Sequence, residues 1–172
     1  MPQDPRILVI ADLNYHAKGH SRLEALKRLG LETRSISHTP IDGASHGGMK
    51  PSIAFRMAWK LGFHPNTEAV NKRLINEALD FKPDIIWIEK GNMIKPATLY
   101  YLRRQFTNTV IASYSEDDMF NPVNRTIAYG RGLRHYHIVF ITKSYNANPN
   151  ELPSLGAHVC QFVDKAFDRK QH

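Results

Sequence analysis

The sequence predicts an α/β fold, a Rossmann-like three-layer α/β/α sandwich with a mainly parallel sheet of about six strands. The first observation is that short apolar runs typical of strands alternate along the chain with stretches of helical periodicity. The second is that the run over residues 84–89 is apolar enough for the centre of a sheet covered on both faces. Alternation of this kind is typical of parallel sheets with helices packed on them.

Composition sets the size and class of the protein. The 172 residues, 42% of them hydrophobic, suit one domain over residues 1–172 with a real core. The apolar run at residues 7–11 is too short to span a bilayer or to form a secretory core, so we expect a cytoplasmic protein without a membrane span. The one cysteine, Cys160, excludes an internal disulfide framework and is expected to be a small buried hydrophobe.

The net charge of +7 favours acidic partners such as phosphates, nucleotides or nucleic acid. The basic residues are scattered, however, and no basic run reaches five residues. A solvated surface is therefore favoured over a nucleic-acid groove, and nucleic-acid binding is kept only as a third hypothesis.

The strands and helices follow in order. Strands are expected over residues 6–12, 32–37, 84–89, 109–113, 137–141 and 158–163. The first helix should run from Gly19 to about Leu29, with Gly30 ending it. A turn-rich loop over residues 38–51 precedes two helices between residues 52 and 80, and Pro96 suits the first turn of the next helix. Asn121 and Pro122 are expected as N-cap and first residue of a helix through about Arg134, and a short helix should end at Gly156.

Open parallel sheets bind ligands beyond the carboxyl ends of their strands. Four of the expected strands are followed by polar or charged segments, at residues 12–20, 89–92, 115–118 and 142–145. We therefore expect these four segments to converge on one edge of the sheet, although they lie far apart in sequence.

Adjacent carboxylates stand out at this edge. Glu116, Asp117 and Asp118 are consecutive, and if they pack together at least one should have a raised pKa and could act as a general base. Lys90 and Lys143 could offset these charges or bind phosphate. The alternative is that Asp117 and Asp118 only solvate a loop and help to cap the following helix.

His20 is a second candidate base, because a helix N-terminus would lower its pKa and keep it neutral. The alternative is an exposed histidine in the capping region. His16 and His20 are four residues apart, a spacing found in helical metal sites, but Gly19 at the expected helix start argues against one. His135 and His137 are expected to be structural, and Trp59 and Trp87 to belong to the core.

Several motifs are absent. The first turn lacks G-x-G-x-x-G, and neither G-x-x-x-x-G-K-[ST] nor G-x-S-x-G occurs. The sequence thus argues against a standard dinucleotide fingerprint, a P-loop NTPase and a nucleophile elbow.

Four blocks resemble, in collinear order, the motifs of CgeB-like (spore-maturation-protein-like) glycosyltransferases. The blocks are residues 82–91 with 94–99, residues 114–120, residues 141–146 with 155–157, and residues 165–168. The first resembles a P-D-hydrophobic-x-K-G block followed by P-x-T-L, the second a D-D-x-F turn, and the third a T-K-x-Y-N block followed by G-A.

The resemblance implies a GT-B enzyme, in which two Rossmann-like domains face a cleft. This chain would be the N-terminal, acceptor-side half, inactive alone and needing a C-terminal GT-B domain in cis or in trans. That second domain would hold the nucleotide-sugar donor, and the family has no D-x-D metal site, so no metal or other cofactor is expected. A stand-alone Rossmann-like module that binds a nucleotide or a partner without catalysis is the alternative.

Within this hypothesis the candidate catalytic residues are His20, Glu116 and Asp118. The candidate substrate-binding residues are Asp12, Asn14, Gly19, Lys90, Gly91, Asp117 and Lys143.

Overall fold

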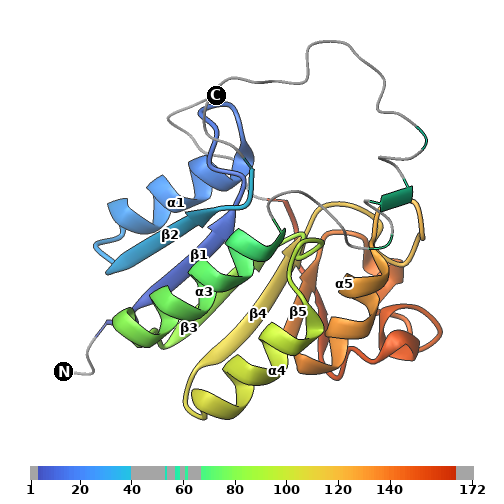
Figure 1. Ribbon diagram of the computed structural model, residues 1–172. Coiled ribbons are helices and arrows are strands. Elements are labelled where there is room, and N and C mark those ends of the chain that lie inside the picture. The colour runs from blue at the N-terminus through green and yellow to red at the C-terminus, as the bar shows by residue number, and fades with distance from the viewer. Residues whose placement is uncertain (1–3, 40–52, 54–56, 59–60, 62–66, 166–172) are drawn as a thin grey trace.

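The parallel α/β architecture is confirmed in a computed structural model, which describes residues 4–39, 53, 57–58, 61 and 67–165. Six strands form one all-parallel sheet with the order β2-β1-β3-β4-β5-β6 (Figure 1). They are β1 (Ile7–Ala11), β2 (Thr33–Ser37), β3 (Ile85–Glu89), β4 (Val110–Ser115), β5 (Ile138–Ile141) and β6 (Cys160–Phe162).

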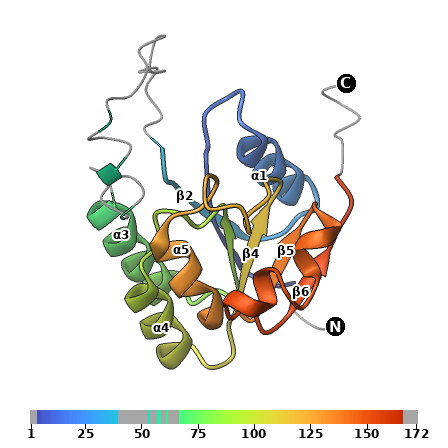
Figure 2. The ribbon, with the colours of Figure 1, turned by 90° about the vertical axis from the view of Figure 1, so that its right-hand side faces the viewer.

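Helices lie on both faces of this sheet. They are α1 (Lys18–Arg28), α3 (Thr67–Phe81), α4 (Pro96–Gln105) and α5 (Ile127–Gly132). Helix α1 lies on one face, and α3, α4 and α5 lie on the other (Figure 2). Side chains that alternate along β1 serve both faces: Ile10 joins the larger core under α3 and α4, whereas Val9 packs with Leu23 of α1. This double burial explains why the strands are apolar runs.

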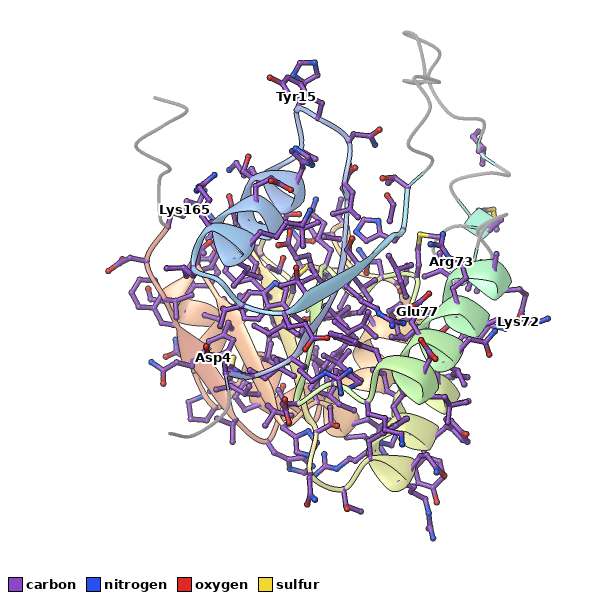
Figure 3. The ribbon with its side chains drawn as sticks, turned by 90° about the vertical axis from the view of Figure 1, so that its left-hand side faces the viewer. Asp4, Tyr15, Lys72, Arg73, Glu77 and Lys165 are labelled. Atoms are coloured by element: carbon purple, nitrogen blue, oxygen red, sulfur yellow. The ribbon has the colours of Figure 1, made fainter. Side chains whose placement is uncertain are left out.

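The larger core lies under three helices because each of them presents an apolar stripe to the sheet. Leu74 of α3 and Leu102 of α4 are fully buried there. Lys72 and Arg73 of α3 are exposed to solvent, whereas Glu77 is half-buried and pairs with Arg34 of β2 (Figure 3). The helix is therefore amphipathic in the way that its 3.6-residue periodicity indicates.

Trp87 lies on β3 as expected but is only half-buried. Its ring stacks with those of Tyr114 of β4 and Phe140 of β5, with centroid distances of 5.4 and 5.7 Å. The three rings form a row across neighbouring strands on the face that α1 covers near β1.

The helix predicted from Asn121 begins later, so that prediction is wrong. Its N-cap is Thr126, whose Oγ1 accepts a hydrogen bond from the Tyr129 N–H at 3.1 Å. The Asn121 side chain instead accepts from the Val123 N–H, and Asn124 donates to the Asp118 carbonyl. Side-chain to backbone bonds of this kind hold residues 118–124 in turns and compete with helix formation.

Other predicted boundaries are close to the observed ones. Strand β4 continues two residues beyond the expected end, to Ser115. Gly30 and Gly156 end their helical segments with φ of 79° and 108°, as their positions predict. Residues 40–51 of the expected loop, Trp59 and most of the expected helix over residues 52–62 lie outside the described residues.

The order of the strands creates a switch point between β1 and β3. The chain leaves β1 for β2 on one side and later returns to β3 on the other side of β1. At such a point the connections diverge, which leaves a crevice beyond the carboxyl ends of the two strands. In the part of the chain that the structure describes, no helix is long and apolar enough to cross a membrane.

Candidate functional site

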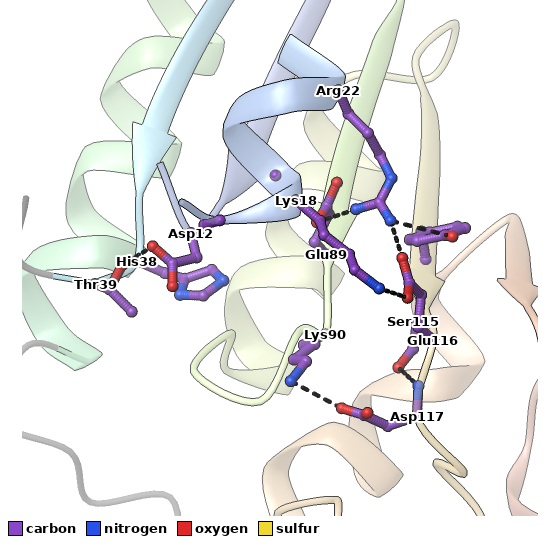
Figure 4. Close-up of a pocket in the computed structure, with 13 residues that line it drawn as sticks. Asp12, Lys18, Arg22, His38, Thr39, Glu89, Lys90, Ser115, Glu116 and Asp117 are labelled. Atoms are coloured by element: carbon purple, nitrogen blue, oxygen red, sulfur yellow. Dashed lines mark hydrogen bonds and ion pairs between the residues drawn. The ribbon is translucent and has the colours of Figure 1, made fainter. Parts of the chain in front are cut away.

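A cleft of about 440 Å³ lies at the carboxyl ends of β1, β3 and β4, beside the first turn of α1 (Figure 4). Its position is the one that the switch point predicts. It is lined by Asp12, Ala17, Lys18, Gly19, Arg22, His38, Thr39, Glu89, Lys90, Tyr114, Ser115, Glu116 and Asp117.

Gly19 sets how closely α1 approaches β1. A Cβ at this position would lie 2.5 Å from the Asp12 carbonyl oxygen and 2.7 Å from the Ala11 Cβ. These distances are shorter than non-bonded contacts allow, so only glycine fits here without a shift of the backbone. The glycine thereby brings Lys18 and Arg22, on the first turns of α1, to the strand ends.

Arg22 joins α1 to two strands. Its guanidinium donates to Glu89 at 2.8 Å, to the Tyr114 hydroxyl at 3.2 Å and to Glu116. It also lies 4.3 Å from the centre of the Tyr114 ring, within the range of a cation–π interaction. Burial alone would lower the pKa of Arg22, but the charge of Glu89 leads a set of interactions that raise it, so Arg22 is a fixed cation.

Glu116 is held as an anion. It pairs with Lys18 and Arg22, and Lys165 lies 3.6 Å away. Burial would raise the pKa of Glu116, but the hydrogen bond from Lys18 and the charge of Arg22 outweigh it and lower the pKa below its usual value. The raised pKa expected for a general base in this turn is therefore wrong for Glu116.

The corner after β3 has an unusual backbone. Lys90 and Gly91 both have positive φ, 59° and 52°. A Cβ on Gly91 would lie 2.5 Å from the Tyr136 hydroxyl oxygen, so a side chain would collide with the core. Lys90, which is not glycine, carries strain in this conformation, and its ammonium pairs with Asp117 at 2.8 Å.

Asp12 directly follows β1, and the contacts of its two carboxylate oxygens differ. The Asn14 N–H, the Asn14 amide and the Thr39 hydroxyl all donate to Oδ1, at 3.1, 2.7 and 2.6 Å. Oδ2 receives none of these three hydrogen bonds. Burial would raise the pKa of Asp12, but the hydrogen bonds from Thr39 and Asn14 and the charge of His38 lower it. Asn14 thus positions Asp12 and is not itself among the lining residues.

The structure brings together five of the residues singled out in the sequence: Asp12, Gly19, Lys90, Glu116 and Asp117. Gly91 lines a neighbouring pocket instead.

His20, Asp118 and Lys143 are not in the lining of this cleft. His20 is half-buried beside the ring of Tyr15, at 6.0 Å, and Tyr15 projects outward from the loop before α1 (Figure 3). Lys143 follows β5, which is separated from β3 by β4, so it lies about 10 Å further along the sheet edge.

Asp118 has a structural position. Its Oδ1 accepts hydrogen bonds from the backbone N–H groups of Phe120 and Asn121 and from the Asn146 amide, at 3.1, 3.2 and 2.9 Å. Glu116, Asp117 and Asp118 therefore point to three different sets of partners, and the expected carboxylate cluster does not form. Asp118 thus holds the turn together and does not cap the following helix, which begins at Ile127.

Sequence reasoning did not single out Lys18, Arg22, His38, Thr39 or Tyr114 as candidate binding residues. Lys18 and Arg22 are four residues apart, and residues at this spacing share one face of a helix. That spacing next to Gly19 was the available signal. His38 and Thr39 directly follow the expected strand over residues 32–37, and Tyr114 follows the one over residues 109–113. Their position after a strand end was therefore the available signal.

The cleft has three cationic side chains, Lys18, Arg22 and Lys90, and four carboxylates, Asp12, Glu89, Glu116 and Asp117. A concave site with opposed, fixed charges can bind polar groups that both donate and accept hydrogen bonds. Among the described residues, no group of three or more His, Cys, Asp or Glu side chains could hold a metal ion.

The fold and this cleft define the chain as a parallel α/β domain with a polar cleft at its topological switch point. Its sequence matches no model of a known protein family. It also has no significant match among curated proteins.

Proposed function

We propose that this chain is the acceptor-side half of a GT-B-type glycosyltransferase, and that the cleft between β1, β3 and β4 binds the hydroxyl groups of the acceptor. The observation that supports it best is the alternation of fixed cations and carboxylates around a cleft at the carboxyl ends of parallel strands. Hydroxyl groups can donate to the carboxylates and accept from the cations, so a polyhydroxy compound matches both kinds of wall.

The charges that line this cleft disfavour binding of the nucleotide-sugar there. A nucleotide diphosphate would meet four carboxylates, and the three cations are already paired with some of them. Phosphate is usually bound where backbone N–H groups and unopposed cations meet. The proposal therefore assigns the nucleotide-sugar to a second Rossmann-like domain, in cis or in trans, and the acceptor to this one.

Asp12 is the best-placed base in this proposal, in place of His20 and Asp118. Three donors fix its Oδ1, and Oδ2 remains to accept a hydrogen bond from an acceptor hydroxyl. As that hydroxyl oxygen forms its bond to the anomeric carbon, the bond to the diphosphate breaks, the diphosphate leaves with the electron pair, and the proton passes to Asp12. Glu116 and Asp117 are positioning residues, because they hold Lys18, Arg22 and Lys90.

The test uses the complete gene product, or this chain supplied with a complementing second domain, and measures sugar transfer from a panel of nucleotide sugars. Asp12→Asn should lower kcat by about 10²-fold or more, with a smaller effect on KM, because it removes the proton acceptor but keeps the shape. Asp80→Asn is the control, since Asp80 is an exposed residue of α3 far along the chain from the cleft.

Absence of transfer from every nucleotide sugar, together with no change in melting temperature with any acceptor, would contradict the proposal. Transfer that is equally fast in the Asp12→Asn enzyme would remove Asp12 from its assigned role.

A second candidate function is a stand-alone binding module. The pairing of the ionic groups within the cleft favours it, because fixed ion pairs suit recognition as well as catalysis. This candidate predicts saturable binding of a small polar ligand to the isolated chain, and no turnover after addition of any second domain.

A further inference from the structure

A second pocket, of about 160 Å³, adjoins the charged cleft on the other side of the Lys90–Gly91 corner. The two cavities share four lining residues, His38, Thr39, Glu89 and Lys90. They therefore form two compartments of one site and not two separate sites.

Most of the exposed wall of the second compartment is apolar. Ile10 of β1, Ile88 of β3 and Ile94 belong to its walls and are almost fully buried in the core beneath. Met93 adds a flexible thioether wall. A water molecule needs two to four polar partners to be stable, and walls of this kind offer few. An apolar group from a ligand would replace such poorly bound water favourably.

The backbone at the boundary is strained. Lys90 and Gly91 hold two consecutive positive φ values between the compartments, and the Lys90 N–H donates to the Tyr114 carbonyl at 2.8 Å. Gly91 packs so closely on Tyr136 that no side chain fits. Strain that the surrounding structure maintains is concentrated at ligand sites, and here it lies at Lys90, which lines both compartments.

We infer that the ligand is an amphipathic, ring-bearing alcohol, whose ring occupies the apolar compartment and whose hydroxyl groups reach into the charged cleft. The volume suits one six-membered ring, aromatic or alicyclic, rather than a long alkyl chain. The hydroxyl next to the ring would pass the shared wall of Glu89 and Thr39. Only the identification of this ligand as an acceptor rests on the proposed glycosyl transfer.

The experiment is a titration of the ¹⁵N-labelled chain with benzyl alcohol and cyclohexanol, followed by amide chemical shifts, with glycerol as the polar control. We expect saturable shifts at residues 38–39 and 90–94, with a Kd on the order of 1 mM for benzyl alcohol, as the size of the probe allows. Glycerol should bind at least about tenfold more weakly, because it has no apolar ring to bury. Equal affinity for glycerol, or no saturable shifts at these amides, would overturn the inference.

Two substitutions locate the ring. Met93→Glu should weaken benzyl alcohol binding by about tenfold or more, because it places a charge in the apolar wall. Leu29→Glu makes the same kind of change at a residue that is 74% exposed at the end of α1, and it should leave binding unchanged. If Met93→Glu does not fold, Met93→Ala takes its place with an expected loss of about threefold. Unchanged binding in the folded Met93 variant would place the ring elsewhere and overturn the inference.

Transfer assays separate this inference from the proposed function. Saturable ring binding without transfer by the two-domain enzyme would support the apolar compartment and contradict the glycosyltransferase. Transfer to glycerol or simple sugars with no preference for alcohols that carry an apolar ring would support the glycosyltransferase and contradict the apolar compartment.

Discussion

The geometry of the cleft depends on the absence of a Cβ atom at Gly19. The first turn of α1 rests on the end of β1, with the Asp12 carbonyl where a Cβ would be. Gly19→Ala must therefore move α1 or the strand end, and we expect a loss of about 2–4 kcal/mol in the free energy of unfolding. Urea denaturation followed by circular dichroism measures it.

Gly130→Ala is the matched control for this substitution. Gly130 is also helical, in α5, but its nearest contact would be 3.6 Å from the added Cβ. Alanine has the higher helix propensity, so the free energy of unfolding should rise by up to about 1 kcal/mol. A loss at Gly130 as large as that at Gly19 would show that close packing on β1 is not the cause.

Glu116 tests the ion pairs around Arg22. Glu116→Gln leaves Lys18, Arg22 and Lys165 without a shared anion, and we expect it to destabilise the fold by about 1–2 kcal/mol at pH 7. The control is Glu68→Gln, because the Glu68 side chain is 82% exposed and its pairing with Lys95 is screened by solvent. Equal, small effects of both substitutions would mean that the Arg22 network does not stabilise the fold.

The lowered pKa of Glu116 also predicts how the stabilities of the wild type and of Glu116→Gln depend on pH. A carboxyl group with a pKa below its unfolded value of 4.5 stabilises the fold fully above that value. The stabilisation then declines as pH falls through 4.5 towards the folded pKa, and it is absent below it. The stability difference between wild type and Glu116→Gln should therefore be constant from about pH 6 to 8 and shrink under acid conditions. A difference that grows as pH falls would reverse the assigned direction.

At the scale of elements, the start of α5 shows where local sequence signals are overridden. Asn121 and Pro122 form a favourable N-cap pair, yet the helix begins at Ile127. Asn92, which follows β3, accepts from the Thr126 N–H and donates to the Asn124 carbonyl, both at 2.9 Å. These contacts join segments more than thirty residues apart, so no pattern within residues 121–134 indicates them.

Two alanine substitutions distinguish the two caps. Thr126→Ala removes the acceptor for Tyr129 and the donor to the Asn92 carbonyl, and it should cost about 1–2 kcal/mol. Asn121→Ala removes one exposed turn contact and should cost less than about 0.5 kcal/mol. Chemical denaturation of both variants measures the difference. A larger loss of stability in Asn121→Ala than in Thr126→Ala would show that Asn121 is the N-cap of this helix.

The same reasoning explains which parts of the site the sequence could predict. Polar residues at the strand ends were expected at one edge, because the carboxyl ends of parallel strands share an edge whatever their order. Lys143 also follows a strand at this edge, but its distance from the cleft depends on the order of the strands, which cannot be read from periodicity. Asp118 lies outside the lining of the cleft because in this tight turn consecutive side chains point to different partners.

At the scale of the whole molecule, the fold was predictable because strands buried on both faces must be apolar runs, and such runs are visible in sequence. The uneven distribution of helices was not predictable. Three helices cover one face, and in the described part of the chain α1 is the one helix on the other. The half-buried row of Trp87 and Phe140 follows from this asymmetry.

The reactivity of Cys160 on β6 shows whether this last strand stays packed on the sheet in solution. Burial raises the pKa of its thiol to about 11 from an ordinary 9.0, so at pH 8 the reactive thiolate is about a hundredfold rarer in the folded protein than in the unfolded chain. We expect modification by a disulfide reagent to be slowed by at least that factor and to become fast on denaturation.

The rate of this modification as a function of urea distinguishes separation of β6 alone from unfolding of the whole protein. Among the described residues, β6 pairs with β5 alone, at the edge of the sheet. Separation of this strand alone would therefore give a rate that is nearly independent of urea. Global unfolding would give a rate that rises with the full denaturant dependence of the equilibrium. A thiol in the native protein that reacts as fast as a free cysteine would show that β6 is not packed on the sheet in solution.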